Sequence, residues 1–238
     1  MNDPQKTFSA TFAFQPIVDI QRHTIFAYEA LVRTKSDDSA GTVFSSLAAD
    51  TLHEFDRDAR VAAISLGSRL GLSDVLSLNF LPRALDTVPD SVSSTLDAAK
   101  EFGIASERLI LEVTENEIIH DTFGFAQKIN RYRSSGMRFA IDDFGAGYSG
   151  LNLLADFQPD LVKLDMNLVR AIDSKGPRQA IVRAVLQACS DLGVEVIAEG
   201  VETEPEFHWF RRHGVVLFQG YLFGRPAFEA LPPANRFA

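Results

Sequence analysis

The chain of 238 residues is long enough for one large domain, and its 46% hydrophobic content is ordinary for a globular core. The formal net charge of −9 argues against unaided binding to duplex DNA, so an anionic substrate would need metal ions or a local basic group. The single cysteine, Cys189, excludes an intrachain disulfide and a cysteine-rich zinc site.

The sequence shows neither the apolar pattern of a membrane span nor that of an export signal. No apolar run approaches the roughly 18 residues that a membrane span needs, and the N-terminal MNDPQKTFSA lacks a hydrophobic signal core. We therefore expect a cytoplasmic protein without a membrane partner. Residues 1–10 are expected to form a polar tail, and residues 11–238 a single domain.

Strands and helices alternate along most of the chain. Two strands come first, FAFQPIVDI and residues 23–33, joined by a short polar turn as in a hairpin. Helices are predicted near 42–51 and 53–70. The later strands are VLSLNFLP, LILEVTE, RFAI, LVKLDM, EVIAEGV and LFQGY, and the helices between them are SVSSTLDAAKEFG, DTFGFAQKINRYRSSG, GLNLLADF, 177–192 and 204–213. Asp121 is the expected N-cap of its helix.

This alternation predicts parallel strand pairing, in either a barrel or an open doubly wound sheet. About eight strands over this length favour a (β/α)₈ barrel, with the first hairpin as a departure from strict repetition. No strand-to-helix turn carries a glycine-rich dinucleotide fingerprint, which disfavours the Rossmann alternative.

Polar side chains recur at the carboxyl ends of the predicted strands, where barrel enzymes place their chemistry. A single buried carboxylate is more often part of a structural ion pair, and a solvated Asp-Asp turn is common. Polar residues on seven consecutive strands that converge on one rim instead favour a functional site, because buried carboxylates are costly unless they are paired or bind metal. The positions are Glu29, Asn79, Glu112 with Glu115, Asp142 with Asp143, Lys163 with Asp165, Glu199 with Glu202, and Gln219.

The adjacent carboxylates Asp142 and Asp143 can share a site only where their strand ends, since neighbouring strand side chains point to opposite faces. Gly145 and Gly147 would supply the backbone freedom to re-aim one of them. Oxygen donors without cysteine or histidine favour Mg²⁺ or Mn²⁺ over zinc. There is room for two ions bridged by Asp142, which would clamp a phosphate oxygen and activate a water. Lys163 would add positive charge or position that water, with a structural salt bridge as the alternative.

The strings YEALVR, LNFLP, LEVTE, IDDFGAGYS, VKLD, IAEGVE and FQGY, in this order and spacing, resemble the EAL-domain family of bacterial cyclic-di-GMP phosphodiesterases from about Phe14 to Pro226. The resemblance implies a TIM-like (β/α)₈ barrel whose first strand is antiparallel to the others. It also implies hydrolysis of cyclic di-GMP to linear pGpG with two Mg²⁺ or Mn²⁺ ions, in bacterial signalling and biofilm control. Ca²⁺ is expected to inhibit, because its looser coordination fits poorly where Mg²⁺ holds the geometry.

The resemblance also assigns roles to single residues. The implied metal ligands are Glu29, Asn79, Glu112 and Asp142, with Asp143 at the second ion. Lys163 would orient the nucleophilic water, and Glu199 and Gln219 would complete the catalytic ring with Glu29. Implied substrate contacts are Gln15, Leu31, Arg33 and Asp165. Glu115 resembles a loop-anchoring glutamate tied to dimerisation, and Glu202 would support the site from behind.

Two features bear on regulation. Ala146 replaces the commoner threonine or serine of the family motif, and TKSDDSAGT is similar to the subgroup in which the module follows a photosensory domain. We therefore expect a homodimer, with a sensory domain or partner in a full-length context. The alternative function is a catalytically silent EAL module that acts as a cyclic-di-GMP receptor or protein-interaction domain, and the intact acidic ring with Lys163 favours the hydrolase.

Overall fold

The computed structural model describes residues 10–38, 40–45, 47–48, 51–114, 121–147 and 150–235. Its strands are β1 (Ala10–Asp19), β2 (Thr24–Thr34), β3 (Val75–Phe80), β4 (Leu109–Thr114), β5 (Arg138–Phe144), β6 (Leu161–Leu164), β7 (Glu195–Ala198), β8 (Leu217–Gln219) and β9 (Ala227–Phe228). Its helices are α1 (Ala40–Ser45), α2 (Leu52–Arg69), α3 (Ala84–Thr87), α4 (Ser93–Glu101), the 3₁₀ turn η1 (Ser106–Arg108), α5 (Thr122–Arg133), α6 (Gly150–Phe157), α7 (Met166–Val169), α8 (Gly176–Leu192) and α9 (Glu204–Arg212).

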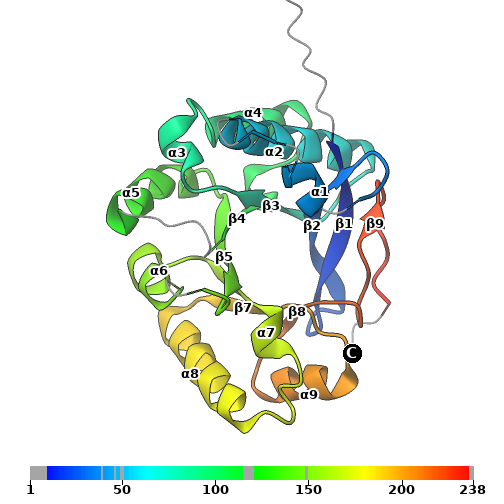
Figure 1. Ribbon diagram of the computed structural model, residues 1–238, viewed down its shortest axis with the longest axis vertical. Coiled ribbons are helices and arrows are strands. Elements are labelled where there is room, and N and C mark those ends of the chain that lie inside the picture. The colour runs from blue at the N-terminus through cyan, green and yellow to red at the C-terminus, as the bar shows by residue number, and fades with distance from the viewer. Residues whose placement is uncertain are drawn as a thin grey trace, which may run out of the picture.

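Strands β1 to β8 close into a barrel, and the helices surround it (Figure 1). Strands β2 to β8 pair in parallel and in chain order. Strand β1 closes the barrel by pairing antiparallel with both β2 and β8. The predicted TIM-like (β/α)₈ barrel with an antiparallel first strand is therefore confirmed.

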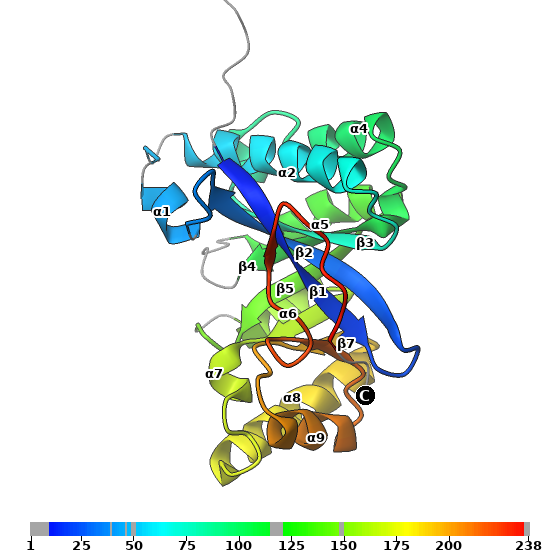
Figure 2. The same cartoon turned by 90° about the vertical axis from the view of Figure 1, so that its right-hand side faces the viewer.

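A ninth strand, β9, is an addition that the sequence analysis does not predict. It pairs antiparallel with Ala13 and Phe14, on the edge of β1 where β8 pairs with residues 17–19. Residues 20–23, between β1 and β2, form only a turn. The C-terminal segment that carries β9 runs across the outside of the hairpin formed by β1 and β2, and Figure 2 shows this segment in red.

Several elements end earlier than their sequence patterns suggest. Strand β6 stops at Leu164 because the Asp165 side chain caps α7, accepting a hydrogen bond of 2.9 Å from the Asn167 N–H. Helix α1 ends at Ser45, so the described residues do not support the helix predicted near 42–51. The predicted N-cap of α5 is confirmed, because the Asp121 carboxylate accepts a 2.8 Å hydrogen bond from the Gly124 N–H.

The barrel has two distinct ends (Figure 2). Helices α1 and α7, which follow β2 and β6, lie at one end, and the β1–β2 turn lies at the other. The end with α1 and α7 is therefore the rim formed by the carboxyl ends of the parallel strands. None of the helices in the described ranges combines the length and apolar composition that a membrane span requires. The expected boundary between tail and domain stays a prediction, since residues 1–9 lie outside those ranges.

Candidate active site

Two layers of side chains fill the barrel. The lower layer is an apolar plug of Ile17, Ala27, Ile110, Ala140, Leu161, Ile197 and Leu217. Side chains alternate along a strand, so the residue two positions nearer the rim faces the same interior. We call that second layer the polar ring, and it consists of Gln15, Glu29, Glu112, Asp142, Lys163, Glu199 and Gln219. Gln15 comes two positions before the plug residue Ile17, and not after it, because β1 runs antiparallel to the other strands.

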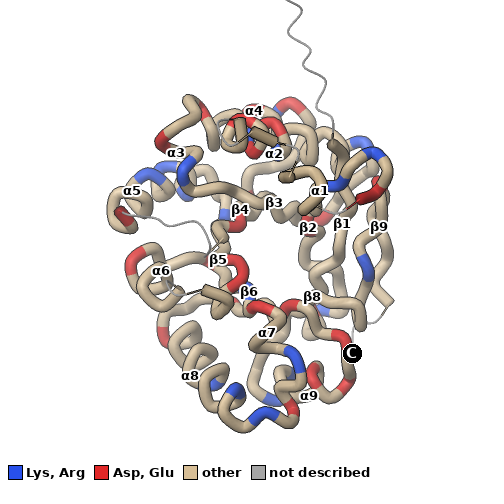
Figure 3. The backbone as a smooth tube through the Cα atoms, viewed as in Figure 1, with Lys and Arg blue, Asp and Glu red and all other residues tan. Residues whose placement is uncertain are grey.

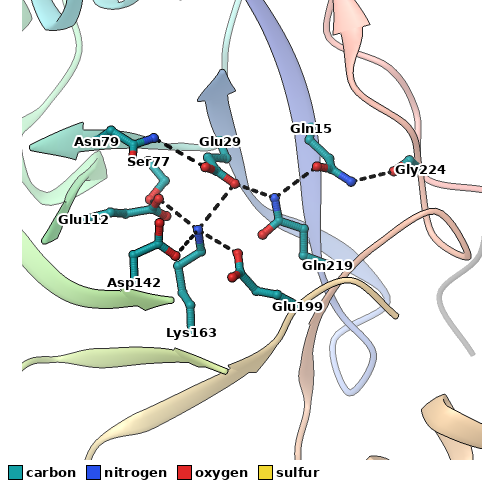
Figure 4. Close-up of polar contacts among 10 residues, drawn as sticks. All are labelled: Gln15, Glu29, Ser77, Asn79, Glu112, Asp142, Lys163, Glu199, Gln219 and Gly224. Atoms are coloured by element: carbon teal, nitrogen blue, oxygen red, sulfur yellow. Dashed lines mark hydrogen bonds and ion pairs between the residues drawn. The ribbon is translucent and has the colours of Figure 1, made fainter. Parts of the chain in front are cut away.

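Lys163 lies at the centre of the polar ring (Figure 4). Its Nζ atom is 2.8 Å from an oxygen of Glu112 and 2.7 Å from one of Glu199. It also lies 3.0 Å from Asp142 and 3.3 Å from Glu29. The lysine side chain is only 1% exposed, so its charge is neutralised by these carboxylates rather than by water. The structure therefore brings together five of the residues that the sequence assigns to one site.

The electrostatics of the polar ring follow from burial and crowding. Burial, opposed by Lys163 and reinforced by the charges of Glu29 and Asp142, raises the pKa of Glu112 to about 8. Burial likewise raises the pKa of Glu199 well above its ordinary value. Burial alone would lower the pKa of Lys163, but the four carboxylates around it raise that pKa well above its ordinary value. Lys163 is therefore a fixed positive charge at neutral pH.

Backbone geometry at the end of β5 lets two adjacent carboxylates reach one site. Asp143 has a left-handed backbone, with φ of 54°, and the pairing between β5 and β6 shifts register between Ile141 and Phe144. The re-aiming therefore occurs at Asp143 itself, whereas the sequence analysis assigned it to Gly145 and Gly147. Gly145 also has positive φ, but a Cβ there would lie 2.3 Å from the Leu168 side chain, so this glycine permits close packing.

The oxygen atoms of the site fit divalent cations. Two groups of three carboxylates, Glu29 with Glu112 and Asp142, and Asp142 with Asp143 and Glu199, each have ligand atoms within 4.8 Å of one another. Asp142 belongs to both groups, and its Oδ1 lies 3.0 Å from Nζ of Lys163. When all five carboxylates are deprotonated, as metal binding requires, they carry five negative charges and Lys163 one positive charge, a formal total of −4 that two divalent ions would balance.

Amides and a hydroxyl support the ring carboxylates. The Gln219 amide donates a 2.6 Å hydrogen bond to Glu29, and Asn79 lies 3.4 Å from the other oxygen of the same carboxylate. The Ser77 hydroxyl donates a 2.6 Å hydrogen bond to Glu112. Sequence reasoning missed Ser77, although a polar residue two positions before Asn79 in an apolar strand is a usable signal.

The other residues assigned from the sequence lie around the ring. Leu31 lines a pocket beside it, and the Arg33 side chain donates to the Val32 carbonyl at 2.9 Å and lies 3.7 Å from Asp37. Asp165 lines a second pocket while capping α7. Glu202 pairs with Arg170 through two contacts of 2.8 Å and lines the same second pocket. Glu115 lies outside the described residues, so its assignment stays a prediction.

Two pockets flank the ring and share Glu29. The larger, of about 350 Å³, is mostly apolar and reaches from Asn79 to Phe44, Phe55 and the carboxylate of Asp56. The smaller, of about 230 Å³, is lined by the ring residues Gln15, Glu199 and Gln219 and by Met166 and Tyr221. Figure 3 shows acidic positions of β2, β4 and β5 gathered around the centre of the barrel. An elongated anionic molecule could span both pockets only with cations at its middle.

Comparisons with known proteins agree with this geometry. The EAL domain model matches residues 5–226. The chain is 46% identical to a standalone versatile EAL protein from Vibrio cholerae O395 in its c-di-GMP-bound form, with a TM-score of 0.91 over 97% of this chain and 98% of that one. It is 40% identical to Klebsiella pneumoniae BlrP1 in a manganese/cy-diGMP complex, with a TM-score of 0.88 over 96% of this chain and 58% of that one.

A longer relative provides context. The chain is 36% identical to the blue light- and temperature-regulated antirepressor BluF of Escherichia coli over 95% of its own length, but it spans only 56% of that protein. Both BluF and BlrP1 therefore contain a further part that this chain does not match.

Proposed function

Because this chain belongs to the EAL-domain family, we propose that it is a metal-dependent phosphodiesterase that hydrolyses cyclic di-GMP to linear pGpG. The observation that carries the proposal is the polar ring itself, in which four carboxylates surround Lys163 and Asp142 is common to two groups of ligands. A purely structural ion pair would use one carboxylate for one lysine, whereas this ring has a large excess of negative charge.

The residues of the polar ring would have different roles in hydrolysis. Glu29, Asn79, Glu112 and Asp142 would hold one Mg²⁺ or Mn²⁺ ion, and Asp142, Asp143 and Glu199 a second. When bound, the ions supply Lewis acidity at the phosphate and a more acidic water. Lys163 donates a hydrogen bond that orients the attacking water, and Gln219 holds Glu29 in place. The water oxygen bonds to phosphorus, the bond from phosphorus to the ribose O3′ breaks, and O3′ leaves with a proton.

The two pockets suit the two halves of a cyclic dinucleotide. With the scissile phosphate at the polar ring, one guanine would enter the larger pocket between Leu31 and Phe44. Asp56 lines this pocket and its carboxylate, which is paired with Arg60, would also accept from the N1–H and N2–H groups of guanine. Arg33 would leave its weak 3.7 Å contact with Asp37 to pair with a phosphate oxygen.

Assembly and context form the second part of the proposal. Phe123 and Leu151, at the starts of the neighbouring helices α5 and α6, are 70% and 66% exposed, which supports a homodimer through this face. Sedimentation of the wild type and of Phe123→Glu tests the dimer. A sensory domain or separate partner would regulate the enzyme, as the longer relatives suggest. We place the enzyme in the cytoplasm because its proposed substrate is an intracellular second messenger.

The test is a time course of purified protein with cyclic di-GMP in Mg²⁺, in Mn²⁺ and in chelator, with pGpG and GMP resolved by chromatography. The proposal expects pGpG only with metal, and none with Asp142→Asn. A receptor of the silent type would instead bind cyclic di-GMP tightly without turnover under all three conditions, which would contradict the proposal.

A further inference from the structure

One side chain links the polar ring to the C-terminal strap, which we define as residues 224–235. Gln15 is buried, and both ends of its amide are used. Its Nε2 donates to the Gly224 carbonyl at 3.1 Å, and its Oε1 accepts from the Gln219 amide at 3.4 Å. Figure 4 shows the resulting series of contacts from Gly224 through Gln15 and Gln219 to Glu29.

These contacts fix which way the Gln219 amide points. Its Nε2 has two acceptors, Glu29 at 2.6 Å and Gln15 at 3.4 Å, one for each hydrogen. The Oε1 atom of Gln219 is consequently directed away from both Glu29 and Gln15. It is buried, accepts no hydrogen bond from the described part of the chain, and belongs to a residue that lines the smaller pocket with Glu199. A buried acceptor without a donor is costly, so this position suits a water or a substrate hydroxyl.

The strap is held in a position that only glycine permits. A Cβ at Gly224 would lie 2.5 Å from Cγ of Pro16, so the strap backbone rests directly on β1. Further along, β9 pairs with β1, the Thr11 hydroxyl donates to Glu229 at 2.5 Å, and the Tyr28 hydroxyl donates to the Pro232 carbonyl at 2.8 Å. The position of the Gly224 carbonyl, which accepts the hydrogen bond from Gln15, is therefore set by the close packing of Gly224 on Pro16.

We propose that Gln15 is a positioning residue, which holds the Gln219 amide so that its Nε2 retains Glu29 and its Oε1 accepts a hydrogen bond from the attacking water. Gly224, at the start of the strap, holds Gln15 in turn, so this end of the strap is part of the active-site architecture. This inference rests on the proposed hydrolysis and differs from the role expected from the resemblance, in which Gln15 contacts the substrate.

The kinetic test compares Gln15→Met, Gln219→Met and the double variant with the wild type. A positioning role predicts that Gln15→Met lowers kcat about three- to tenfold, the effect of one modest hydrogen bond, with KM unchanged. The double variant should be no slower than Gln219→Met alone, because Gln15 acts through Gln219. A raised KM with unchanged kcat, or additive losses in the double variant, would show direct substrate contact and overturn the proposal.

Matched variants separate positioning from general packing. Thr11→Val removes a strap contact on the same strand without touching the amide series, and it should leave kcat unchanged. Gly224→Ala should reproduce the kcat loss of Gln15→Met, because the added Cβ displaces the carbonyl that holds Gln15. If Thr11→Val and Gln15→Met lowered kcat equally, the loss would reflect the general stability of the strap, and this result would contradict the proposal.

A second readout does not depend on turnover. In ¹⁵N-labelled protein without metal, the side-chain amide of Gln219, identified by its loss in Gln219→Met, should be protected from exchange. We expect that protection to fall in Gln15→Met and to remain in Thr11→Val. Unchanged protection in Gln15→Met would overturn the positioning role even in an active enzyme. If the wild type does not hydrolyse cyclic di-GMP, the proposed function is wrong. The exchange measurement would still decide, independently of activity, whether Gln15 orients Gln219.

Discussion

The Nζ atom of Lys163 lies 2.8 Å from Oε2 of Glu112, and neither side chain is more than 1% exposed. The contact lowers the cost of burying both groups, since the Lys163 charge would be very costly at this depth without a polar partner. Three further carboxylates, Glu29, Asp142 and Glu199, come from other strands and lie 2.7–3.3 Å from Nζ of Lys163. The lysine therefore keeps the acidic site folded before any metal binds.

Replacing Lys163 with methionine tests this role. Because the change leaves Glu112 buried without its partner, we expect the free energy of unfolding of the metal-free protein to fall by about 3–5 kcal/mol. Divalent metal should recover part of that loss, since it binds only the folded state. Urea denaturation with and without Mn²⁺ measures both effects. Lys128→Met, which removes an exposed pair with Asp86, is the control and should cost less than about 1 kcal/mol.

Metal affinity should depend on pH. The pKa of Asp143 is raised to about 6, first by burial and then by the charge of Asp142, and that of Glu112 is raised to about 8. Both carboxylates hold protons below these values, and a metal must displace them. We therefore expect the affinity for Mn²⁺ to rise between pH 5 and pH 8.5 in calorimetric titrations, with proton release. Asp143→Asn should lack the rise near pH 6, and a flat profile in the wild type would contradict the assignment.

Calcium should support binding of the substrate but inhibit its hydrolysis. Ca²⁺ accepts the same oxygen ligands as Mg²⁺, with longer bonds and a looser geometry, so it would hold the phosphate without fixing the attacking water. Rates of pGpG formation at fixed Mg²⁺ and rising Ca²⁺ measure the inhibition. Turnover in Ca²⁺ alone equal to that in Mg²⁺ would show that the geometry of the ions is unimportant.

Glu206 should stabilise the loop beside the smaller pocket. Burial alone would raise its pKa, but N–H groups of Ala171, Glu202 and Thr203 donate to the carboxylate and lower that pKa overall. We expect Glu206→Gln to cost about 1–3 kcal/mol at pH 7, because the new amide faces backbone donors. A lowered pKa stabilises the fold above 4.5, the ordinary value, and this contribution is lost as pH falls through the lowered value. Urea denaturation at pH 7 and pH 3.5 should show the difference shrinking.

Much of the site could be predicted from the sequence because side chains alternate between the two faces of a strand. The apolar residue two positions before each of Glu112, Asp142 and Lys163 lies in the plug, so a period of two predicts both layers. Helix capping at Asp121 was predictable for a similar reason, because the interaction is local.

Other features depend on tertiary contacts that no local pattern carries. Strand β9 has only two residues and exists because the strap packs on β1. The left-handed backbone of Asp143 arises at an irregular pairing with β6, and aspartate gives only a weak signal for it. The use of both ends of the Gln15 amide requires Gln219 and Gly224, which are more than 200 residues away in sequence.

The most direct test of the central claim, hydrolysis by two divalent ions held in the polar ring, is to count ions and product in the same samples. Metal-free wild type and Asp142→Asn receive Mn²⁺ in steps, free Mn²⁺ is measured by electron paramagnetic resonance, and pGpG by chromatography. We predict two bound ions in the wild type, pGpG only as the second ion binds, and neither tight binding nor product in Asp142→Asn, because Asp142 belongs to both ligand groups. Full turnover in Asp142→Asn, or two tightly bound ions in the wild type without any pGpG, would contradict the claim.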